Sequence, residues 1–432
     1  MSYGKVVLLL LLTLCLSVAG WAQPAEKRAE TKGQTSEADR ARFDELRAQG
    51  FEALYNLDYE GARRKFKELS RLFPEHPAGP QFLAATLWTQ TLYQSRRLQA
   101  SVYNTESFYA KNEDKVDPQI IQQFRELIRQ AKQLAEARLK RNARDTEALY
   151  YLGAIEGLKA AFAYAVERRF VAAALDGSRS ADRHRDVVKL DPSFHDAEVT
   201  IGIYDYTVGG LTLPLKIMVG LTGARGSKKR GLETLERVTR EGKWARDDAR
   251  IVLIALYKRE GRFADAVNVA RELGGKYPRN YLFKLEMADA LASQASVERK
   301  ANRISEAQKL EREAFNAFDS LLLDRSTRES AARLLDLIHF QYGEALLVAG
   351  QPEAAAKEYL AAAAVAGADA GLATMARLRA AQAYDLAGKR NEALTQYKVV
   401  LERPNIYDAH DEAKQGLREP YKPKNTGKNT TE

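Results

Sequence analysis

Apolar residues recur at spacings of three, four and seven positions through most of the chain, which is the period of a helix with one buried face. No segment shows the strict alternation of apolar and polar residues that is typical of a half-buried strand. The helical segments follow one another in regular pairs, an arrangement typical of repeat proteins. The pattern therefore predicts an all-α fold built from antiparallel helix hairpins.

Four segments, 43–76, 247–280, 336–369 and 374–407, share the spacing of their small and large residues. Each has an alanine followed four positions later by a residue on the same helical face, and that residue is aromatic in three of the four segments. Small side chains let two helices cross closely, and the aromatic ring fills the space between them. Proline cannot continue a helix and so separates one hairpin from the next. The signature residues are Gly50, Ala62, Phe66, Pro74, Tyr257, Ala266, Leu273, Pro278, Gly343, Ala355, Tyr359, Ala381, Ala393 and Tyr397.

These offsets resemble the tetratricopeptide repeat (TPR), a helix–turn–helix unit. Helix pairs continue between the four clear repeats. They are predicted at 78–94 with 118–142, 145–166 with 168–190, 195–208 with 227–241, and 281–297 with 302–322, and a closing helix at 406–417. The closing helix is expected because a solenoid must cover its last apolar face. The resemblance implies one right-handed α-solenoid of about eight hairpins over residues 40–420.

Residues 1–22 have the features of a secretory signal peptide: Lys5, an apolar stretch after it, and small residues before a predicted cleavage after Ala22. The apolar stretch is shorter than the ~20 residues that a membrane-spanning helix needs. Cys15, the one cysteine of the chain, lies inside this stretch and follows Leu14, whereas bacterial lipidation requires a small residue there. The mature chain is therefore predicted to be exported, periplasmic or secreted, and to contain no cysteine.

Two terminal segments lack any apolar period. Residues 23–39 are predicted to be a disordered leader and residues 421–432 a disordered tail. Two inserts, 95–117 and 209–231, interrupt the repeat. Loops of this kind often carry binding residues, so both inserts are candidates for function.

The first insert combines aromatic and basic side chains. They are Arg96, Arg97, Tyr103, Phe108, Tyr109 and Lys111. One interpretation is a helix extension and loop whose aromatic residues pack on the neighbouring hairpin. The alternative is a binding surface for a partner.

The second insert joins an apolar run to a glycine-rich basic loop at 223–231. One interpretation is a short helix packed into the solenoid, followed by a solvated basic helix start. The alternative is an anion or partner site, in which backbone N–H groups at a helix start act together with basic side chains. Those side chains are Arg225, Lys228, Lys229 and Arg230. The preceding stretch, from Asp191 to the glycines at 209–210, looks like a variant found in exported bacterial TPR proteins, which implies no activity.

No arrangement of residues typical of catalysis is found in the sequence. The five histidines lack the spacing of metal ligands; they are His76, His184, His195, His339 and His410. The acidic pair Asp247-Asp248 falls at a predicted helix start, where it complements the helix dipole. The chain is therefore predicted to be no enzyme and to bind no cofactor or metal.

Lys and Arg number 67 and Asp and Glu 58, which gives a net charge of +9. The two signs alternate along the predicted helices, as on a solvated surface, so nucleic acid is not expected as a partner. The surplus favours acidic partners or peripheral contact with an anionic envelope surface.

The TPR resemblance implies a concave groove lined by first helices, which holds a peptide or partner protein. The candidate groove residues that it implies are Leu54, Tyr55, Trp88, Tyr151, Tyr204, Tyr206 and Tyr257. Some of them are expected to be core residues instead, so none is given an individual role. The predicted function is a non-enzymatic protein–protein interaction scaffold of the bacterial cell envelope. Two alternatives stay open: an envelope protein that binds an anionic lipid, glycan or phosphate group through 223–231, or an accessory subunit of an outer-membrane assembly or export complex. The partner's identity and the oligomeric state stay open as well.

Overall fold

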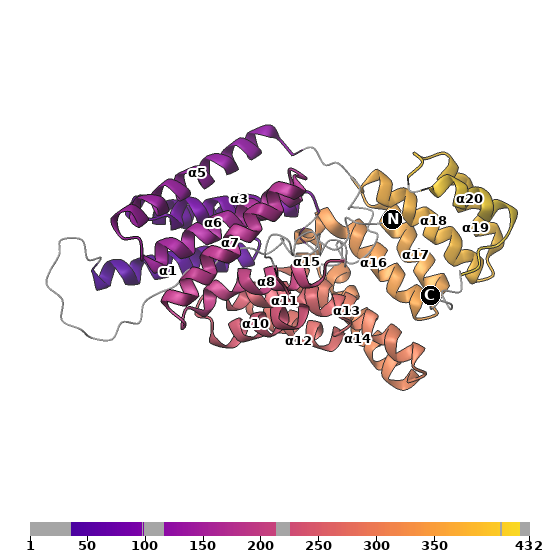
Figure 1. Cartoon of the computed structure of the whole chain (residues 1–432). Helices are drawn as coiled ribbons and strands as arrows, with labels where there is room; N and C mark the ends of the chain where they lie inside the picture. The colour runs from indigo at the N-terminus through magenta and orange to yellow at the C-terminus, as the bar shows by residue number, and fades with distance from the viewer. Residues whose placement is uncertain (1–35, 97, 99–115, 213–224, 407, 424–432) are drawn as a thin grey trace. The chain divides into compact units, whose positions relative to one another are not determined.

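The computed structural model describes residues 36–96, 98, 116–212, 225–406 and 408–423 (Figure 1). Within these ranges the chain forms 18 α-helices, two short 3₁₀ helices and no strand. The all-α prediction is therefore confirmed. None of the described helices is both long and apolar enough to cross a lipid bilayer.

Sixteen of these helices pair into eight successive hairpins, as the periodicity predicts. The pairs are α1 (Glu37–Tyr55) with α2 (Tyr59–Leu72), α3 (Ala78–Gln94) with α5 (Pro118–Arg141), α6 (Thr146–Ala165) with α7 (Phe170–Leu190), α8 (Glu198–Gly209) with α10 (Lys228–Glu241), α11 (Arg246–Arg259) with α12 (Phe263–Lys276), α13 (Tyr281–Lys300) with α14 (Ile304–Leu323), α16 (Leu335–Val348) with α17 (Pro352–Ala364), and α18 (Ala370–Leu386) with α19 (Arg390–Leu401). The short helix α15 (Arg325–Ser330) precedes α16, and α20 (Ala409–Arg418) closes the array.

The chain divides into two compact units. Unit 1 contains the five hairpins from α1 to α12, and unit 2 contains the hairpins from α13 to α19 together with α15 and α20. The predicted continuity of one right-handed solenoid across the two units stays a prediction.

The repeat signature marks the helix crossings. Ala62, Ala266, Ala355 and Ala393 are all completely buried, each in the second helix of its hairpin. A Cβ added at Gly343 of α16 would lie 2.7 Å from Cε1 of Tyr359 on α17, and one added at Gly50 would overlap the ring of Phe66. Each glycine therefore leaves the space that the aromatic ring of the second helix occupies.

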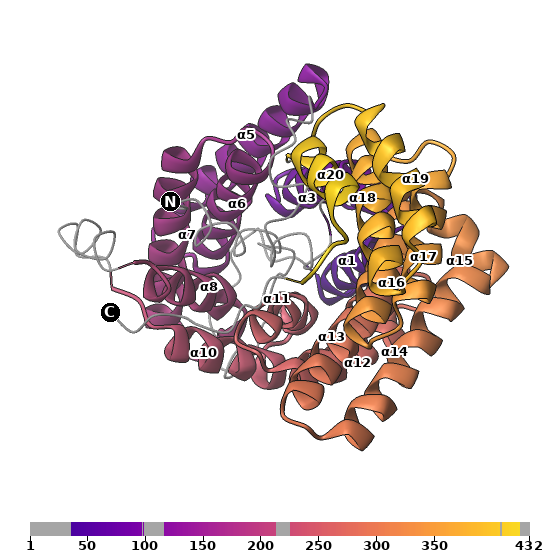
Figure 2. The ribbon, with the colours of Figure 1, turned by 90° about the vertical axis from the view of Figure 1, so that its right-hand side faces the viewer.

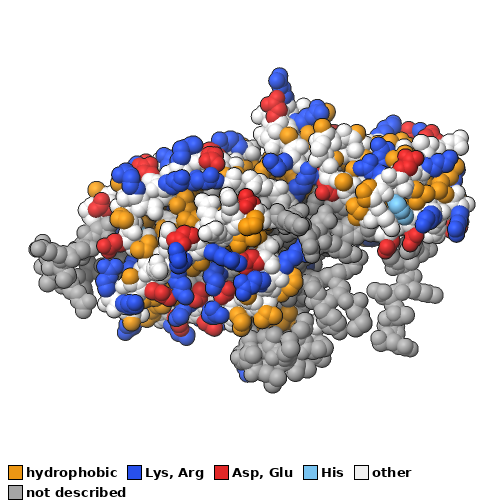
Figure 3. Space-filling view, turned by 90° about the horizontal axis from the view of Figure 1, so that it is seen from above, with side chains coloured by type: hydrophobic (Ala, Val, Ile, Leu, Met, Phe, Trp, Pro, Cys, Tyr) orange, Lys and Arg blue, Asp and Glu red, His pale blue; other side chains and the backbone are white. Residues whose placement is uncertain are grey.

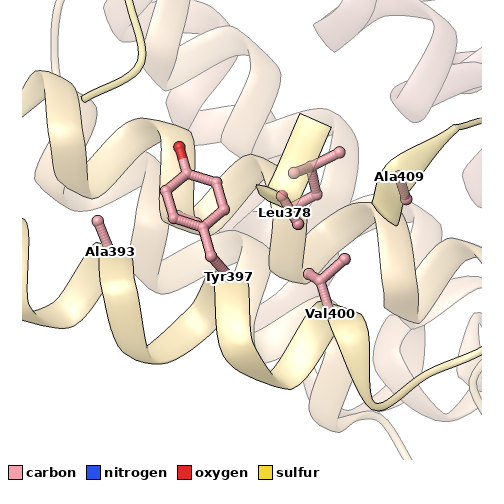
Figure 4. Close-up of a cluster of buried hydrophobic side chains, with 7 residues drawn as sticks. Leu378, Ala393, Tyr397, Val400 and Ala409 are labelled. Atoms are coloured by element: carbon pink, nitrogen blue, oxygen red, sulfur yellow. The ribbon is translucent and has the colours of Figure 1, made fainter. Parts of the chain in front are cut away.

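The last repeat shows the same packing around Tyr397 (Figure 4). Its ring lies among the buried side chains of Leu378 and Val400, and α20 covers them with Ala409. The predicted closing helix therefore covers the final apolar face.

Helix starts and ends follow local signals. Asp117 caps α5 by accepting a hydrogen bond from the Gln119 backbone N–H at 2.8 Å, and Pro118 occupies the first helical position. Pro74 and Pro278, two signature residues, are exposed and lie just beyond the ends of α2 and α12.

Both predicted terminal boundaries differ from the structure by a few residues. α1 begins at Glu37, inside the segment predicted as leader, because Ser36 and Asp39 form a capping box. At the other end, the Tyr421 backbone N–H donates to Asp385 Oδ2 at 2.8 Å, so the first residue of the predicted tail is held by α18.

The crossing geometry predicts opposite effects for two glycine-to-alanine substitutions. Gly343→Ala should lower the free energy of unfolding by about 1–3 kcal/mol, because the new methyl group overlaps Tyr359. Gly275→Ala in α12 meets no atom within 4 Å and should leave stability unchanged or raise it by up to about 1 kcal/mol. Urea unfolding of both variants measures this, and equal stabilities would contradict the crossing role of Gly343.

Candidate functional site

The predicted groove residues are mostly core residues. Leu54, Tyr55, Trp88, Tyr151, Tyr206 and Tyr257 are buried. Tyr204 alone is partly exposed, and the Arg185 guanidinium lies 5.0 Å from its ring centroid. Some of the seven are expected to be core residues, and the structure places six of them in the core, so these six line no open groove. Their large apolar area is used for packing inside unit 1.

One cause of this burial is a contact between the first and the fifth hairpin of unit 1. The Tyr55 hydroxyl, at the end of α1, donates a 2.5 Å hydrogen bond to Asp248 Oδ1 on α11. Asn280 Nδ2 donates to the Tyr55 carbonyl at 2.8 Å, and the Tyr55 and Tyr277 rings lie 5.0 Å apart. In Figure 2, α1 lies beside α11 accordingly. The end of α1 is thus held against the fifth hairpin of the same unit.

The acidic pair Asp247-Asp248 at the start of α11 is part of this contact. The sequence predicted only that the pair complements the helix dipole, and the contact is an additional role. Asp247 Oδ2 accepts hydrogen bonds from Lys276 and, at 2.5 Å, from the Tyr277 hydroxyl, while its Oδ1 accepts one from Arg250. Burial alone would raise the pKa of Asp247, but these hydrogen bonds outweigh it and hold the pKa below its ordinary value. The pair therefore anchors α11 to α12 and α1.

Arg47 of α1 is a buried cation that sequence reasoning missed. Its side chain is 2% exposed, and its guanidinium lies 3.9 Å from the Trp244 ring centroid and 5.6 Å from that of Phe51. Among the described residues Arg47 Nε has no hydrogen-bond partner. Burial lowers the pKa of Arg47. Aromatic faces thus take the place of a carboxylate beside this charge.

Most of the basic side chains of the second insert pair with carboxylates of the chain. Lys228 Nζ lies 2.7 Å from Glu260, and Arg230 pairs with Asp205. Lys229 is 86% exposed and lies 3.8 Å from Glu233, and Arg225 is exposed. Three of the four basic side chains thus pair with a carboxylate of the chain, and the proposed anion site stays a prediction.

The glycines of this loop have a packing role. A Cβ at Gly226 would lie 2.6 Å from the Gly209 backbone nitrogen, and one at Gly231 would lie 2.6 Å from the Gly202 carbonyl oxygen. They therefore allow α8 and α10 to approach closely. Residues 213–224 of this insert lie outside the described residues, as do all the candidates of the first insert except Arg96.

Unit 2 carries a ladder of polar side chains along its first helices. Glu344 of α16 accepts two hydrogen bonds of 2.7 Å from Arg379 of α18. Arg379 Nη1 donates to Gln382 at 3.2 Å, and Gln382 Nε2 donates to Glu412 of α20 at 2.8 Å. Burial alone would lower the pKa of Arg379, but the Glu344 carboxylate raises it well above the ordinary value. Glu344 and Arg379 stay 38% and 25% exposed, so this pair is reachable from solvent, whereas Gln382 is buried.

Two exposed apolar residues accompany this ladder. Val348 is 49% exposed at the end of α16, and Leu386 is 37% exposed at the end of α18. Val348 follows Glu344 by four positions and Leu386 follows Gln382 by four, so each pair shares one helical face. We call Glu344, Val348, Arg379 and Leu386 the α16–α18 surface.

The histidines have structural surroundings. His76, His195 and His339 each lie within 3.3 Å of a carboxylate oxygen, and His410 Nε2 lies 2.8 Å from the Arg403 carbonyl. His184 is buried between Thr200 and the Tyr150 carbonyl. In the part of the chain that the structure describes, no group of three or more His, Cys, Asp or Glu residues could hold a metal ion.

The surface charge is mixed. In the space-filling view of Figure 3, Lys and Arg side chains lie among Asp and Glu side chains over the described surface. This face therefore shows no continuous basic stripe of the kind that follows a nucleic-acid backbone.

The buried small residues at the hairpin crossings define an α-helical repeat protein whose hairpins resemble tetratricopeptide repeats. Solved structures similar to this chain include a thermophilic TPR protein of Thermus thermophilus, with 19% identity and a TM-score of 0.33 over 48% of this chain and 97% of that one. A human IFIT1 dimer with PPP-AAAA has 14% identity and a TM-score of 0.39 over 90% of this chain and 86% of that one. Yeast Tom70 has 10% identity and a TM-score of 0.33, over 87% and 88% respectively.

No protein-family model and no curated protein matches the chain. All three TM-scores are below 0.5, so the repeat type rests on the hairpin packing described above. The RNA named with human IFIT1 is a ligand of that protein. For this chain, the absence of a nucleic-acid partner stays a prediction.

The buried His184 predicts a pH dependence of stability. Burial lowers its pKa to about 4, against 6.5 in the unfolded chain, so the folded state stays neutral where the unfolded state binds a proton. Stability should therefore fall as the pH drops from about 6.5 to about 4, by up to about 3 kcal/mol. His184→Gln should flatten this slope in unfolding measurements between about pH 6.5 and pH 5, and the control His410→Gln should keep it. An unchanged slope in His184→Gln would contradict the assignment.

Proposed function

We propose that this protein is a non-enzymatic protein–protein interaction scaffold that holds a peptide or partner protein on the α16–α18 surface. The carrying observation is the partly exposed Glu344–Arg379 pair, which the buried Gln382 braces, together with the exposed side chains of Val348 and Leu386. Apolar anchors beside fixed donors and acceptors are the combination that protein-binding surfaces use.

The α16–α18 surface replaces the groove residues predicted from the sequence. In unit 1 six of the seven candidate groove residues are buried, and the Tyr55–Asp248 hydrogen bond joins the first helices α1 and α11. In unit 2 the polar ladder is already ordered by internal hydrogen bonds, so its side chains lose little freedom when a partner binds. A partner segment that places apolar side chains on Val348 and Leu386, with polar groups toward Glu344 and Arg379, fits this chemistry.

The proposed place of action is the bacterial cell envelope. The support is the N-terminal sequence, with Lys5, an apolar stretch and a small-residue site at Ala22. An accessory role in an outer-membrane assembly or export complex is a special case of the scaffold, in which the partner is a membrane complex. Binding of an anionic group through 223–231 has less support, because Lys228 and Arg230 already pair with Glu260 and Asp205.

The scaffold proposal predicts loss of partner capture in a double variant. Val348→Asp with Leu386→Asp places two charges on the exposed apolar positions and should weaken capture at least about tenfold. Crosslinking in native envelopes, followed by mass spectrometry, identifies the proteins that wild type captures and the double variant loses.

Leu323→Asp is the matched control for this double variant. Leu323 is 79% exposed at the end of α14, outside the α16–α18 surface, so capture should stay as in wild type. Identical capture by wild type and the double variant would reject the proposed surface.

The export proposal predicts a processed N-terminus. Mass spectrometry of the chain recovered from the periplasmic fraction of a bacterial host should give a mature start at Gln23. Ala22→Arg should block cleavage, and the control Ala25→Arg should be processed as wild type. Recovery of the full-length chain in the cytoplasmic fraction would contradict export.

A further inference from the structure

The start of α7 carries three exposed apolar side chains. Phe170 is 51% exposed, Val171 77% and Leu175 54%. Their spacing places all three within one side of the helix. The Tyr164 ring packs against Phe170 with centroids 5.2 Å apart, and Ala163, Tyr164 and Ala173 form a buried cluster beneath them. The exposed apolar side chains are therefore supported by buried residues packed beneath them.

This patch lies at one edge of unit 1, where several helix ends meet. Phe124, near the start of α5, stacks on Phe162, near the end of α6, with ring centroids 3.8 Å apart. Because α8 packs on α7 and follows it through a short connection at its far end, α8 ends on the same side. The chain departs from this side after Leu98 and Thr212 and returns at Val116 and Arg225. Both sequence insertions therefore leave the hairpins beside the patch.

Two carboxylates near the patch lie beneath the cations that pair with them. Arg125 and Arg169 are both 62% exposed, whereas Glu167, which pairs with both, is 11% exposed. Arg179 and Lys159 are 55% and 39% exposed, and their shared partner Asp176 is 8% exposed. The cations thus face outward and the carboxylates lie beneath them. A surface that approaches this edge meets positive charge first.

We propose that this edge of unit 1 docks on an anionic lipid bilayer. The apolar side chains of Phe170, Val171 and Leu175 enter the boundary between headgroups and acyl chains, and the outward arginines contact the anionic headgroups. A second copy of this chain fits less well, because pairing two such edges brings like charges together. The inference stands apart from the scaffold proposal, since it uses unit 1 residues while the α16–α18 surface belongs to unit 2.

The test is co-sedimentation of the mature full chain with vesicles. Vesicles of phosphatidylglycerol mixed with phosphatidylcholine should bind the protein more strongly than vesicles of phosphatidylcholine alone, and added salt should weaken this binding. Val171→Ser with Leu175→Ser should reduce binding to the mixed vesicles about fivefold or more. Arg125→Glu with Arg169→Glu should do the same and remove the preference for the anionic lipid.

Matched controls come from unit 2. Leu323→Ser changes a 79% exposed leucine, and Arg325→Glu reverses a 92% exposed arginine, so both should bind as wild type. Circular dichroism melts confirm that each variant is folded. Wild-type binding by both α7-edge variants would overturn the proposal, as would the absence of binding to the mixed vesicles at low salt. A loss confined to Lys229→Glu would also overturn it, and would favour the 223–231 loop instead.

Discussion

The fold depends on the close crossing of paired helices. A glycine on one helix leaves space for an aromatic ring on the other, and this allows the two helices to approach. Gly50 faces Phe66 and Gly343 faces Tyr359, sixteen residues later in each case. The alanines beside these rings are fully buried. Because packed interiors tolerate neither voids nor overlap, this pairing sets how near the two helices of a hairpin lie. The other contacts of each hairpin build on that distance.

The periodic part of the fold could be predicted from the sequence. The predicted helix pairs end within three residues of the observed ones, including α3 with α5 on either side of the first insert. Periodicity works here because each hairpin buries a face that its own residues encode at fixed intervals. Local signals such as Asp117-Pro118 also act on neighbouring residues only, which is why they can be read from the sequence.

The parts that could not be predicted involve contacts between distant residues. Tyr55 and Asp248 are separated by 193 positions, and no repeat spacing indicates that they meet. The same holds for Arg47, whose stacking on Trp244 follows from where α1 and α11 lie. The α16–α18 surface was missed for another reason: exposed valine and leucine residues at helix ends are common and show no pattern until the neighbouring helix is placed. The sequence does contain one signal for this surface. Val348 and Leu386 occupy the same position of their repeats, five residues after Gly343 and Ala381 respectively.

The junction between α1 and α11–α12 also bears on how unit 1 comes apart. In an open repeat array each hairpin contacts only its neighbours, so a terminal hairpin can fray while the rest stays folded. In unit 1, release of the first hairpin would strip Asp248 of the Tyr55 hydroxyl and Asn280 of the Tyr55 carbonyl, which costs free energy at the opposite end of the unit. The five hairpins of unit 1 are therefore expected to unfold as a single cooperative block, in which neither terminal hairpin frays before the rest.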